Sequence, residues 1–239
     1  CAAPLKTQDV LEIWPNGVAP GSENAPVKLT ITERSKVAFW PDRIITGITR
    51  PNLTAFVPDK PNGTAVIVAP GGAYARIVLD KEAAEMARWL NPYGVTVLLM
   101  EWGLDPNRIG FLGASAAGHM GALLGAKFDK KVYEPLDAAD QLSARPDFMI
   151  LLYPVVSMEE KLTHPDTRTN LIGKNPSADL IKEYSADQQV SANAPQTFIV
   201  VTEDDPAVPP QNGINYHNAL KKLGVQTELQ SFKVGGHGF

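Results

Sequence analysis

The sequence predicts an α/β fold in which helices cover both faces of a mostly parallel central sheet. Short, continuously apolar runs such as Val66–Ala69 have the length of strands that are buried on both faces. Segments with a helical spacing of apolar residues separate these runs, as in repeated units of strand, helix and strand. The composition, with 44% hydrophobic and 20% charged residues, is typical of a globular chain that buries a core.

We expect an irregular arm followed by one domain. Residues 1–43 are rich in Pro and Gly and show no sustained periodicity, which is typical of irregular structure. The regular pattern begins at residue 44, so the arm should lie over a single domain formed by residues 44–239.

Short strands and one amphipathic helix open this domain. The segments Ile44–Ile48 and Leu53–Val57 are rich in strand-forming residues and are expected to pair antiparallel, while Thr64–Ala69 follows a Pro-Asn-Gly turn. From Asp80, an N-cap candidate, apolar residues recur at helical spacing until Gly94 ends the pattern. We expect a helix between these two residues.

Strands and helices then alternate to the end of the chain. Apolar strands separated by helices indicate a parallel sheet covered on both faces. The predicted strands are Val95–Met100, Arg108–Leu112, Phe148–Leu152, Thr197–Thr202 and Thr227–Phe232, and the predicted helices are Ser115–Lys127 and Gln211–Leu223.

The junction between Met100 and Glu101 does not fit this scheme. Only seven residues, Glu101–Asn107, separate two strands that should be parallel, whereas a crossover between parallel strands takes about a dozen or more. We therefore expect that a segment is missing between Met100 and Glu101. The chain also ends two residues after His237, without a closing helix after the last strand, and we expect truncation or disorder there too.

Composition excludes several classes of function. The net charge is −4 and the 22 basic residues are scattered, so we expect no nucleic-acid partner. No apolar run approaches the roughly 18 residues of a membrane-spanning helix. Cys1 is the only cysteine, which rules out a disulfide within the chain and a cysteine-ligated zinc site. A cysteine at the first position suits a processed bacterial lipoprotein and a chance boundary alike.

The segment around Ser115 has the pattern of a nucleophile elbow. The strand Arg108–Leu112 runs into the turn Gly113-Ala114-Ser115-Ala116-Ala117, and a helix follows. Such a turn needs small residues beside the serine because its backbone packs closely, although Ala117 replaces the usual glycine. A tightly packed turn and a dinucleotide-binding loop are the alternative interpretations, but the spacing G-x-S-x-x-G lacks the glycine pattern of the latter.

A glycine-containing loop follows the buried strand Thr64–Ala69. Its sequence, Pro70-Gly71-Gly72-Ala73-Tyr74, has residues with little or no side chain, so its backbone N–H groups can face a site. The N–H groups of Gly72 and Ala73, together with that of Ala116, are candidates for an oxyanion hole. An ordinary Gly-Gly turn is the alternative interpretation.

An acidic loop and a histidine loop follow later strands. Glu203-Asp204-Asp205 comes directly after a strand, at the edge where open α/β sheets bind ligands. Gly235-Gly236-His237-Gly238-Phe239 follows the last strand, and its glycines suit a loop that presents an imidazole. The other three histidines are interpreted as structural or surface residues: His119, His164 and His217.

Ser115, Asp204 and His237 each follow a strand and occur in the chain order of the α/β-hydrolase triad. On these motifs the chain resembles α/β-hydrolases of the carbohydrate-esterase kind, namely acetylxylan esterases and bifunctional acetylxylan/feruloyl esterases. The similar segments run from about Ile44 to the end and include APGGAYARIVLDKEAAEMARWLNPYGV, EWGLDPNRIGFLGASAAGH, TEDDPAVPPQN and GGHGF.

The resemblance implies an α/β-hydrolase fold and a triad of Ser115, Asp204 and His237, with Asp205 as the second choice for the acid. Relatives of this kind carry a long loop and a helix at the position of Met100-Glu101, which supports the expectation of a missing segment there.

The triad and the resemblance together predict a serine esterase that acts through an acyl-enzyme. The implied substrates are acetyl or feruloyl esters of plant cell-wall carbohydrate such as xylan, with contacts from the stretch Pro154–Gln196, and no metal or cofactor is expected. A serine peptidase of the same fold and an inactive hydrolase-like binding module are the alternatives. We expect an extracytoplasmic location, periplasmic or secreted, with a lipid anchor through Cys1 as one form of it.

Overall fold

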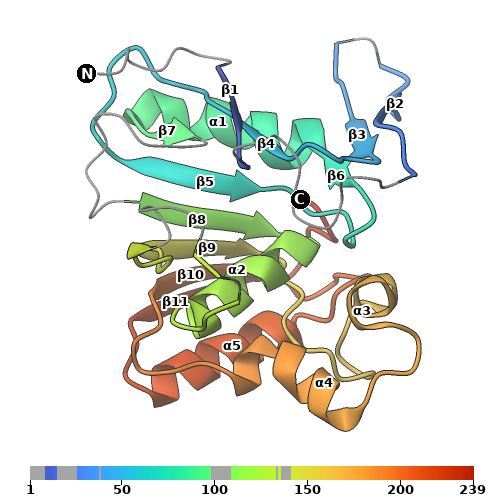
Figure 1. Ribbon diagram of the computed structural model, residues 1–239, viewed down its shortest axis with the longest axis vertical. Helices are drawn as coiled ribbons and strands as arrows, with labels where there is room; N and C mark the ends of the chain where they lie inside the picture. Colours follow the sequence, from blue (N-terminus) through green and yellow to red (C-terminus); the bar gives the residue numbers. More distant parts are fainter. Residues whose placement is uncertain (1–8, 15–25, 38, 98–108, 133, 136–140) are drawn as a thin grey trace. The chain divides into compact units, whose positions relative to one another are not determined.

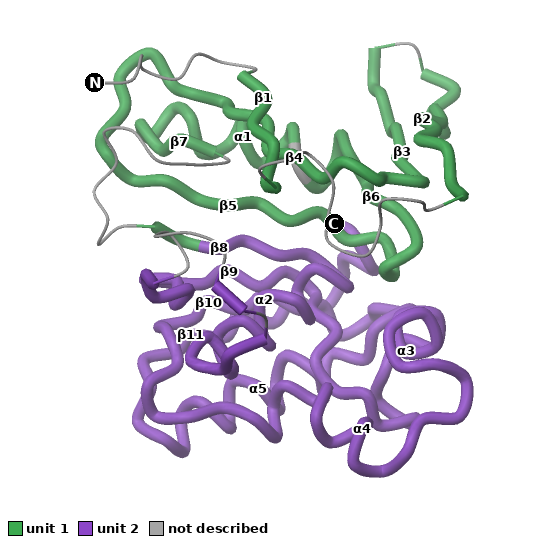
Figure 2. Tube along the Cα trace, viewed as in Figure 1, with its two compact units in different colours: residues 1–110 green, residues 111–239 purple. Residues whose placement is uncertain are grey.

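The computed structural model in Figure 1 describes residues 9–14, 26–37, 39–97, 109–132, 134–135 and 141–239. The chain forms two compact units, residues 1–110 and residues 111–239 (Figure 2). The junction at Met100-Glu101 lies outside the described residues. The division into an arm and one domain at residue 44 stays a prediction.

Unit 1 begins with short antiparallel strands. β1 (Val10–Glu12) pairs with β4 (Asn52–Thr54), and β2 (Thr30–Glu33) pairs with β3 (Arg43–Thr46), which also pairs with β6 (Ile77–Val78). The predicted pairing of β3 with β4 is therefore wrong, because each of these strands takes its partners elsewhere. β1 and β2 lie in the stretch predicted to be irregular, since strands of three and four residues are too short to give a periodic signal.

Two parallel strands and a helical segment follow in unit 1. The apolar strand β5 (Ala65–Ala69) pairs in parallel with β7 (Thr96–Val97). After β6 the chain is helical up to Tyr93, as the sequence predicts, although a π-helical turn opens the segment and a 3₁₀ turn closes it: η1 (Asp80–Ala84), α1 (Glu85–Leu90) and η2 (Asn91–Tyr93). Gly94 ends the segment with a φ of 77°, the left-handed conformation that glycine adopts readily.

Asp80 is not the N-cap that the sequence predicts. Its carboxylate accepts hydrogen bonds from Nη2 of Arg43 at 2.6 Å, from Nε at 3.0 Å and from the backbone N–H at 2.7 Å. The hydrogen bonds from the Arg43 guanidinium hold the pKa of the Asp80 carboxyl below its usual value. The carboxylate therefore ties β3 to the start of the helical segment and is not available to the helix amides.

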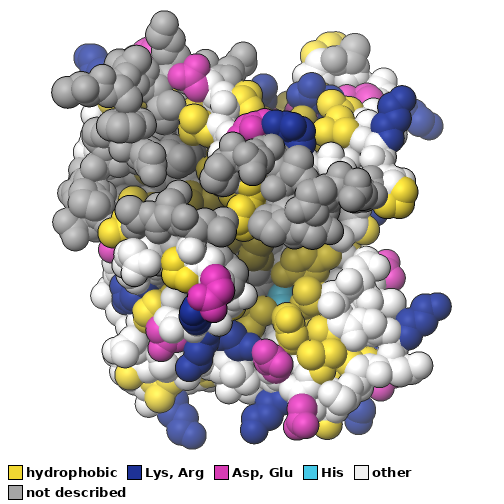
Figure 3. Space-filling model, viewed as in Figure 1, with side chains coloured by type: hydrophobic (Ala, Val, Ile, Leu, Met, Phe, Trp, Pro, Cys, Tyr) yellow, Lys and Arg dark blue, Asp and Glu magenta, His cyan; other side chains and the backbone are white. Residues whose placement is uncertain are grey.

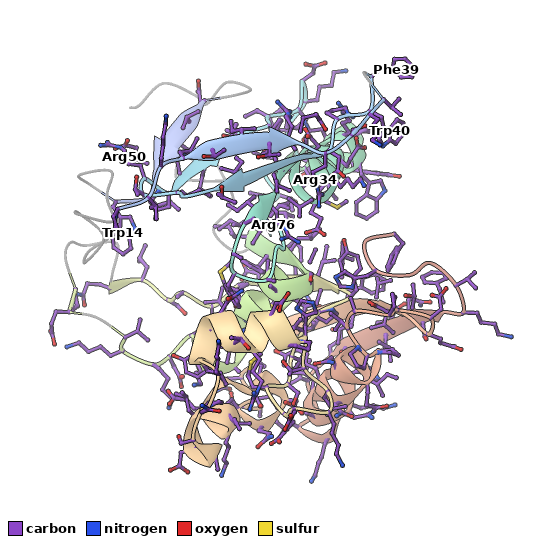
Figure 4. All side chains as sticks on the ribbon, turned by 90° about the vertical axis from the view of Figure 1, so that its right-hand side faces the viewer. Trp14, Arg34, Phe39, Trp40, Arg50 and Arg76 are labelled. Carbon is purple, nitrogen blue, oxygen red and sulfur yellow. The ribbon has the colours of Figure 1, made fainter. Side chains whose placement is uncertain are left out.

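The loop between β2 and β3 presents aromatic side chains to solvent. An ion pair between Arg34 and Asp42, with 2.6 Å between Nη2 and Oδ1, closes the base of this loop. Phe39 and Trp40 lie at its tip with 88% and 65% of their surface exposed, and Figure 4 shows both side chains pointing away from the strands.

Unit 2 holds the parallel sheet that the sequence predicts. Its strands lie in the order β11-β10-β9-β8, and in Figure 1 their arrows point the same way. In the parallel register Thr202 lies beside Phe232, and Val200 lies beside Leu152. The C-terminal ends of the strands therefore share one edge of the sheet. The bounds are β8 (Ile109–Ala114), β9 (Phe148–Leu152), β10 (Gln196–Thr202) and β11 (Thr227–Phe232).

Two helices of unit 2 agree with the sequence prediction and two were not predicted. α2 (Ser115–Lys127) and α5 (Gln211–Lys222) begin where the sequence predicts, and the buried hydroxyl of Tyr216 in α5 donates a hydrogen bond to the Ala122 carbonyl of α2 at 3.1 Å. α3 (Pro165–Ile172) and α4 (Ala178–Tyr184) lie in the stretch after β9.

α3 and α4 pack around a small hydrophobic cluster. In Figure 3 hydrophobic side chains also reach the surface between α2 and α4. The buried members of the cluster are Val155, Met158, Ile172 and Val208.

Small residues let α2 lie close to its neighbours. A Cβ atom at Gly118 would lie 2.6 Å from Cβ of Pro154, and a Cβ atom at Gly125 would lie 2.5 Å from Cε of Met149.

No helix in the described part of the chain is long and apolar enough to cross a membrane.

Candidate active site

Ser115 occupies a sharp turn between β8 and α2. Ala114 is extended, with φ −109° and ψ 143°, whereas Ser115 has a φ of 53°, which is unfavourable for any residue except glycine. The Ser115 carbonyl accepts a hydrogen bond from the Val155 N–H at 3.0 Å, which helps to hold this conformation. A strained serine between a strand and a helix is the geometry of a nucleophile elbow.

The residues two positions before and after Ser115 must be small. A Cβ atom at Gly113 would lie 2.3 Å from the carbonyl oxygen of Ala117, well inside van der Waals contact. Ala117 itself is buried. The turn therefore tolerates alanine in place of the usual glycine after the serine but requires glycine before it.

His237 lies between Ser115 and a carboxylate. Its Nε2 is 2.9 Å from Oγ of Ser115, and its Nδ1 is 2.7 Å from Oδ2 of Asp205. A carboxylate only accepts hydrogen bonds, so Nδ1 carries the proton in the neutral ring and Nε2 accepts from the serine hydroxyl. This arrangement can move a proton from Ser115 to the imidazole.

The carboxylate of Asp205 is held on both of its oxygens. Oδ1 accepts hydrogen bonds from the N–H groups of Ala207 at 2.8 Å and Val208 at 2.9 Å, which leaves Oδ2 directed at His237. The Asp205 side chain is only 2% exposed, so water does not compete with the imidazole. The group is suited to orient His237 and to stabilise its charged form.

Asp204, the first choice for the acid, does not contact the imidazole. Its carboxylate accepts hydrogen bonds from the N–H groups of Gly236 at 2.9 Å and Gly235 at 3.3 Å. The bond from Gly236, followed by that from Gly235, holds the pKa of the Asp204 carboxyl below its usual value. The hydroxyl of Thr202 donates to the Gly236 carbonyl at 2.7 Å. The geometry therefore favours Asp205 as the partner of His237 and makes Asp204 an anchor for the histidine loop.

The candidates for the oxyanion hole lie in two places. Ala116 is in the first turn of α2, where helix N–H groups have no partner within the helix. Gly72 and Ala73 belong to a loop of unit 1 with φ values of 142° and 56°. A Cβ atom at Gly72 would lie 2.1 Å from the carbonyl oxygen of Arg76, so this loop requires glycine there. The part of these residues in an oxyanion hole stays a prediction.

The other histidines have structural contacts. The buried His119 donates from Nε2 to the Tyr184 carbonyl at 2.7 Å. His164 is the N-cap of α3, and Nδ1 of His217 lies 3.2 Å from Oγ1 of Thr227. Among the residues that the structure describes, no group of three or more His, Cys, Asp and Glu side chains could hold a metal ion.

Sequence reasoning missed Asn212, which organises the loop after β9. Oδ1 of this buried residue accepts hydrogen bonds from the N–H groups of Val156 and Ser157 at 2.9 Å and 3.0 Å. Nδ2 donates to the carbonyls of Leu162 at 2.6 Å and Pro209 at 3.0 Å. A single asparagine near a helix start gives no sequence signal for such a role, because its partners come from distant parts of the chain.

Sequence and structure comparisons find related proteins. A family model described as BD-FAE matches residues 99–220. An acetylxylan esterase from Xylanibacter ruminicola is 28% identical over 219 residues, which cover 78% of this chain and 43% of the relative. Endo-1,4-beta-xylanase B from Butyrivibrio fibrisolvens is 33% identical over 138 residues, which cover 58% of this chain and 21% of the relative. The chain thus spans less than half the length of these curated relatives.

Solved structures share the fold. An acetyl ester-xyloside bifunctional hydrolase from Caldicellulosiruptor lactoaceticus superposes with a TM-score of 0.77 at 27% identity, covering 99% of this chain and 89% of the other. A bifunctional GH43-CE protein from Bacteroides eggerthii has a TM-score of 0.66 at 21% identity, covering 78% of this chain and 33% of the other. The predicted α/β-hydrolase fold is confirmed by the first of these likenesses.

Proposed function

The chain belongs to the BD-FAE family, and on that premise we propose that it is a serine esterase with Ser115 as nucleophile, His237 as general base and Asp205 as the acid that orients the base. One observation carries this proposal: Ser115, His237 and Asp205 form a continuous hydrogen-bonded chain with distances of 2.9 Å and 2.7 Å. The strained turn at Ser115 supports it, because a structural serine has no need of that conformation.

The reaction proceeds through an acyl-enzyme. Nε2 of His237 takes the proton of the Ser115 hydroxyl while Oγ attacks the acyl carbonyl, and Asp205 stabilises the imidazolium that forms. The imidazolium then gives its proton to the alkoxide leaving group, which departs as the alcohol. Water then loses a proton to Nε2 as its oxygen attacks the acyl carbon. The bond between Oγ and the acyl carbon breaks, Oγ takes the proton back from the imidazolium, and the carboxylic acid leaves.

The oxyanion of each tetrahedral intermediate needs hydrogen-bond donors. The Ala116 N–H is a suitable donor because it follows the nucleophile directly and lies at the positive end of α2. Gly72 and Ala73, in the loop that follows β5, stay predicted donors on the sequence alone. Backbone donors of this kind stabilise developing charge without any cost of reorganisation.

We propose acetyl or feruloyl esters of xylan as substrates. An acetylxylan esterase and a xylanase are among the relatives, and an acetyl ester-xyloside hydrolase shares the fold over 99% of this chain. An extracytoplasmic location, periplasmic or secreted, fits a polymeric substrate of this kind. The lipid anchor at Cys1 stays a prediction.

Replacement of Ser115 by Ala tests the proposal. We expect turnover of 4-nitrophenyl acetate and release of acetate from acetylated xylan to fall at least about 10⁴-fold, because the remaining groups cannot form the acyl-enzyme. A fluorophosphonate probe should label the wild-type protein and leave the Ser115→Ala variant unlabelled. Ser35→Ala, in the loop between β2 and β3, is the matched control and should keep both activity and labelling.

Other results would contradict the proposal. Full activity of the Ser115→Ala variant would show that another residue is the nucleophile. A wild-type protein that is neither labelled nor active on any ester would favour the inactive binding module. Faster cleavage of peptide nitroanilides than of esters would favour the peptidase.

A further inference from the structure

Tyr153 lies at the C-terminal end of β9 with a backbone conformation that its side chain disfavours. Its φ is 35°, in the left-handed region, where a bulky residue is a true outlier. Its N–H donates to the Val200 carbonyl of β10 at 2.7 Å, so pairing within the sheet holds the residue in this conformation. A strained residue that its surroundings hold in place is a candidate for a functional role.

The aromatic ring of Tyr153 lies against the imidazole of His237. The two ring centroids are 4.8 Å apart, with an angle of 64° between the ring planes, which is the favourable edge-to-face arrangement. The Tyr153 ring also lies edge-to-face against Phe239, with 5.1 Å between the ring centroids and 74° between the ring planes. Tyr153 is 4% exposed, whereas 23% of the His237 side chain is exposed. The buried ring therefore limits the movement of the partly exposed one.

The residues next to Tyr153 contact the serine turn. The Val155 N–H donates to the Ser115 carbonyl, and Pro154 packs so closely against α2 that Gly118 has no room for a Cβ atom. The segment from Tyr153 to Val155 thus contacts the nucleophile through its backbone and the base through its ring. One rigid segment can set the distance between Ser115 and His237.

We propose that Tyr153 is a positioning residue whose ring, held by the strained end of β9, keeps the His237 imidazole aligned between Ser115 and Asp205. Asp205 fixes only one nitrogen of the imidazole, and the ring could still rotate about that hydrogen bond. Edge-to-face contact with a second ring restricts this rotation. The inference rests on the proposed function, because alignment matters only if His237 serves Ser115.

Two variants separate the ring of Tyr153 from its hydroxyl and from its bulk, and a third variant elsewhere in β9 is the control for stability. Tyr153→Phe keeps the ring and should retain kcat within about threefold. Tyr153→Leu keeps an apolar side chain without the ring, and we expect kcat for 4-nitrophenyl acetate to fall about 10- to 100-fold, since small errors of alignment cost this much. KM should stay within about threefold, because Tyr153 acts through His237. Met149→Ala, at a buried position of the same strand, should lower stability and leave kcat unchanged.

Nuclear magnetic resonance of the His237 ring gives a readout that does not depend on activity. In the wild-type and Tyr153→Phe proteins the ring protons should be shifted by the neighbouring aromatic ring, and in Tyr153→Leu this shift should disappear and the signals should broaden. If Tyr153→Leu does not fold, Tyr153→Met takes its place with the same expected results. Folding of each variant is checked by circular dichroism.

Two outcomes would overturn the inference. Tyr153→Leu with a wild-type kcat would show that the ring is not needed, and Tyr153→Phe with a kcat as low as that of Tyr153→Leu would assign the effect to the hydroxyl. Failure of the proposed function looks different, since the wild-type protein would then hydrolyse no ester and resist the fluorophosphonate probe. The resonance comparison would still decide whether Tyr153 orders the imidazole.

Discussion

Asp204 and Asp205 are adjacent and chemically identical, yet the fold gives them different partners. Asp205 is buried against His237, and Asp204 is exposed and holds the glycines that precede the histidine. The sequence could predict that an acid at this loop serves His237, because both loops follow neighbouring strands. It could not choose between the two residues, since the direction of each side chain depends on backbone angles in an irregular loop.

The two aspartates are therefore expected to differ in their effect on activity. Asp205→Asn should lower kcat by about 10³- to 10⁴-fold, because an amide cannot orient and stabilise the imidazolium as a carboxylate does. Asp204→Asn still offers an oxygen to the Gly236 N–H and should lower kcat less than about tenfold. Steady-state kinetics on 4-nitrophenyl acetate measures both. The reverse order of effects would restore Asp204 as the acid.

At the level of elements, the sequence predicts best the apolar strands and the helices that alternate with them in unit 2. The bounds of α2, β9 and β11 agree with the prediction to the residue. α3 and α4 were missed because they span only eight and seven residues, although Pro165 in the first turn of α3 and Ser177 before α4 are start signals that could have indicated them. β1 and β2 are shorter still, and only their pairing makes them strands.

The glycines of α2 allow a prediction about packing. Gly118→Ala would force a Cβ atom against the backbone and ring of Pro154, which cannot move without disturbing the end of β9. We expect a loss of about 1–3 kcal/mol in the free energy of unfolding. Gly125→Ala meets the flexible end of the Met149 side chain and, at 3.3 Å, Cδ of Pro195. It also gains helix propensity, so its change should stay within about 1 kcal/mol.

Urea titration of the two variants under the same conditions makes this comparison. Equal stability of the Gly118→Ala and Gly125→Ala variants would contradict the packing argument, since both glycines are buried positions of one helix.

At the level of the whole molecule, stability depends on a buried histidine outside the candidate site. Burial lowers the pKa of His119 from 6.5 to about 4, with a further lowering from Lys127 that the Tyr184 carbonyl opposes. The unfolded chain therefore binds a proton at this residue below pH 6.5, whereas the folded chain does not bind it until about pH 4. The stabilising effect is full above pH 6.5 and is lost as the pH falls toward 4.

We expect His119 to contribute to acid unfolding. A pKa difference of this size corresponds to about 3 kcal/mol of stability lost between pH 7 and pH 4. Urea titrations across this range should show a smaller loss for His119→Gln, which keeps a hydrogen-bond donor for the Tyr184 carbonyl and cannot be protonated. Parallel curves for the two proteins would show that His119 does not titrate in this way.

The hydrogen bond between Ser115 and His237 joins residues that are 122 positions apart. No local segment can form this hydrogen bond, because it requires β9, β10 and β11 to have paired in the sheet. During refolding, α2 can become helical long before its first residue acquires a proton acceptor. Chemical reactivity of the serine would then be the last property that the chain regains. An electrophilic probe would therefore label only fully folded molecules, whereas circular dichroism would also detect partly folded molecules in which α2 is already helical.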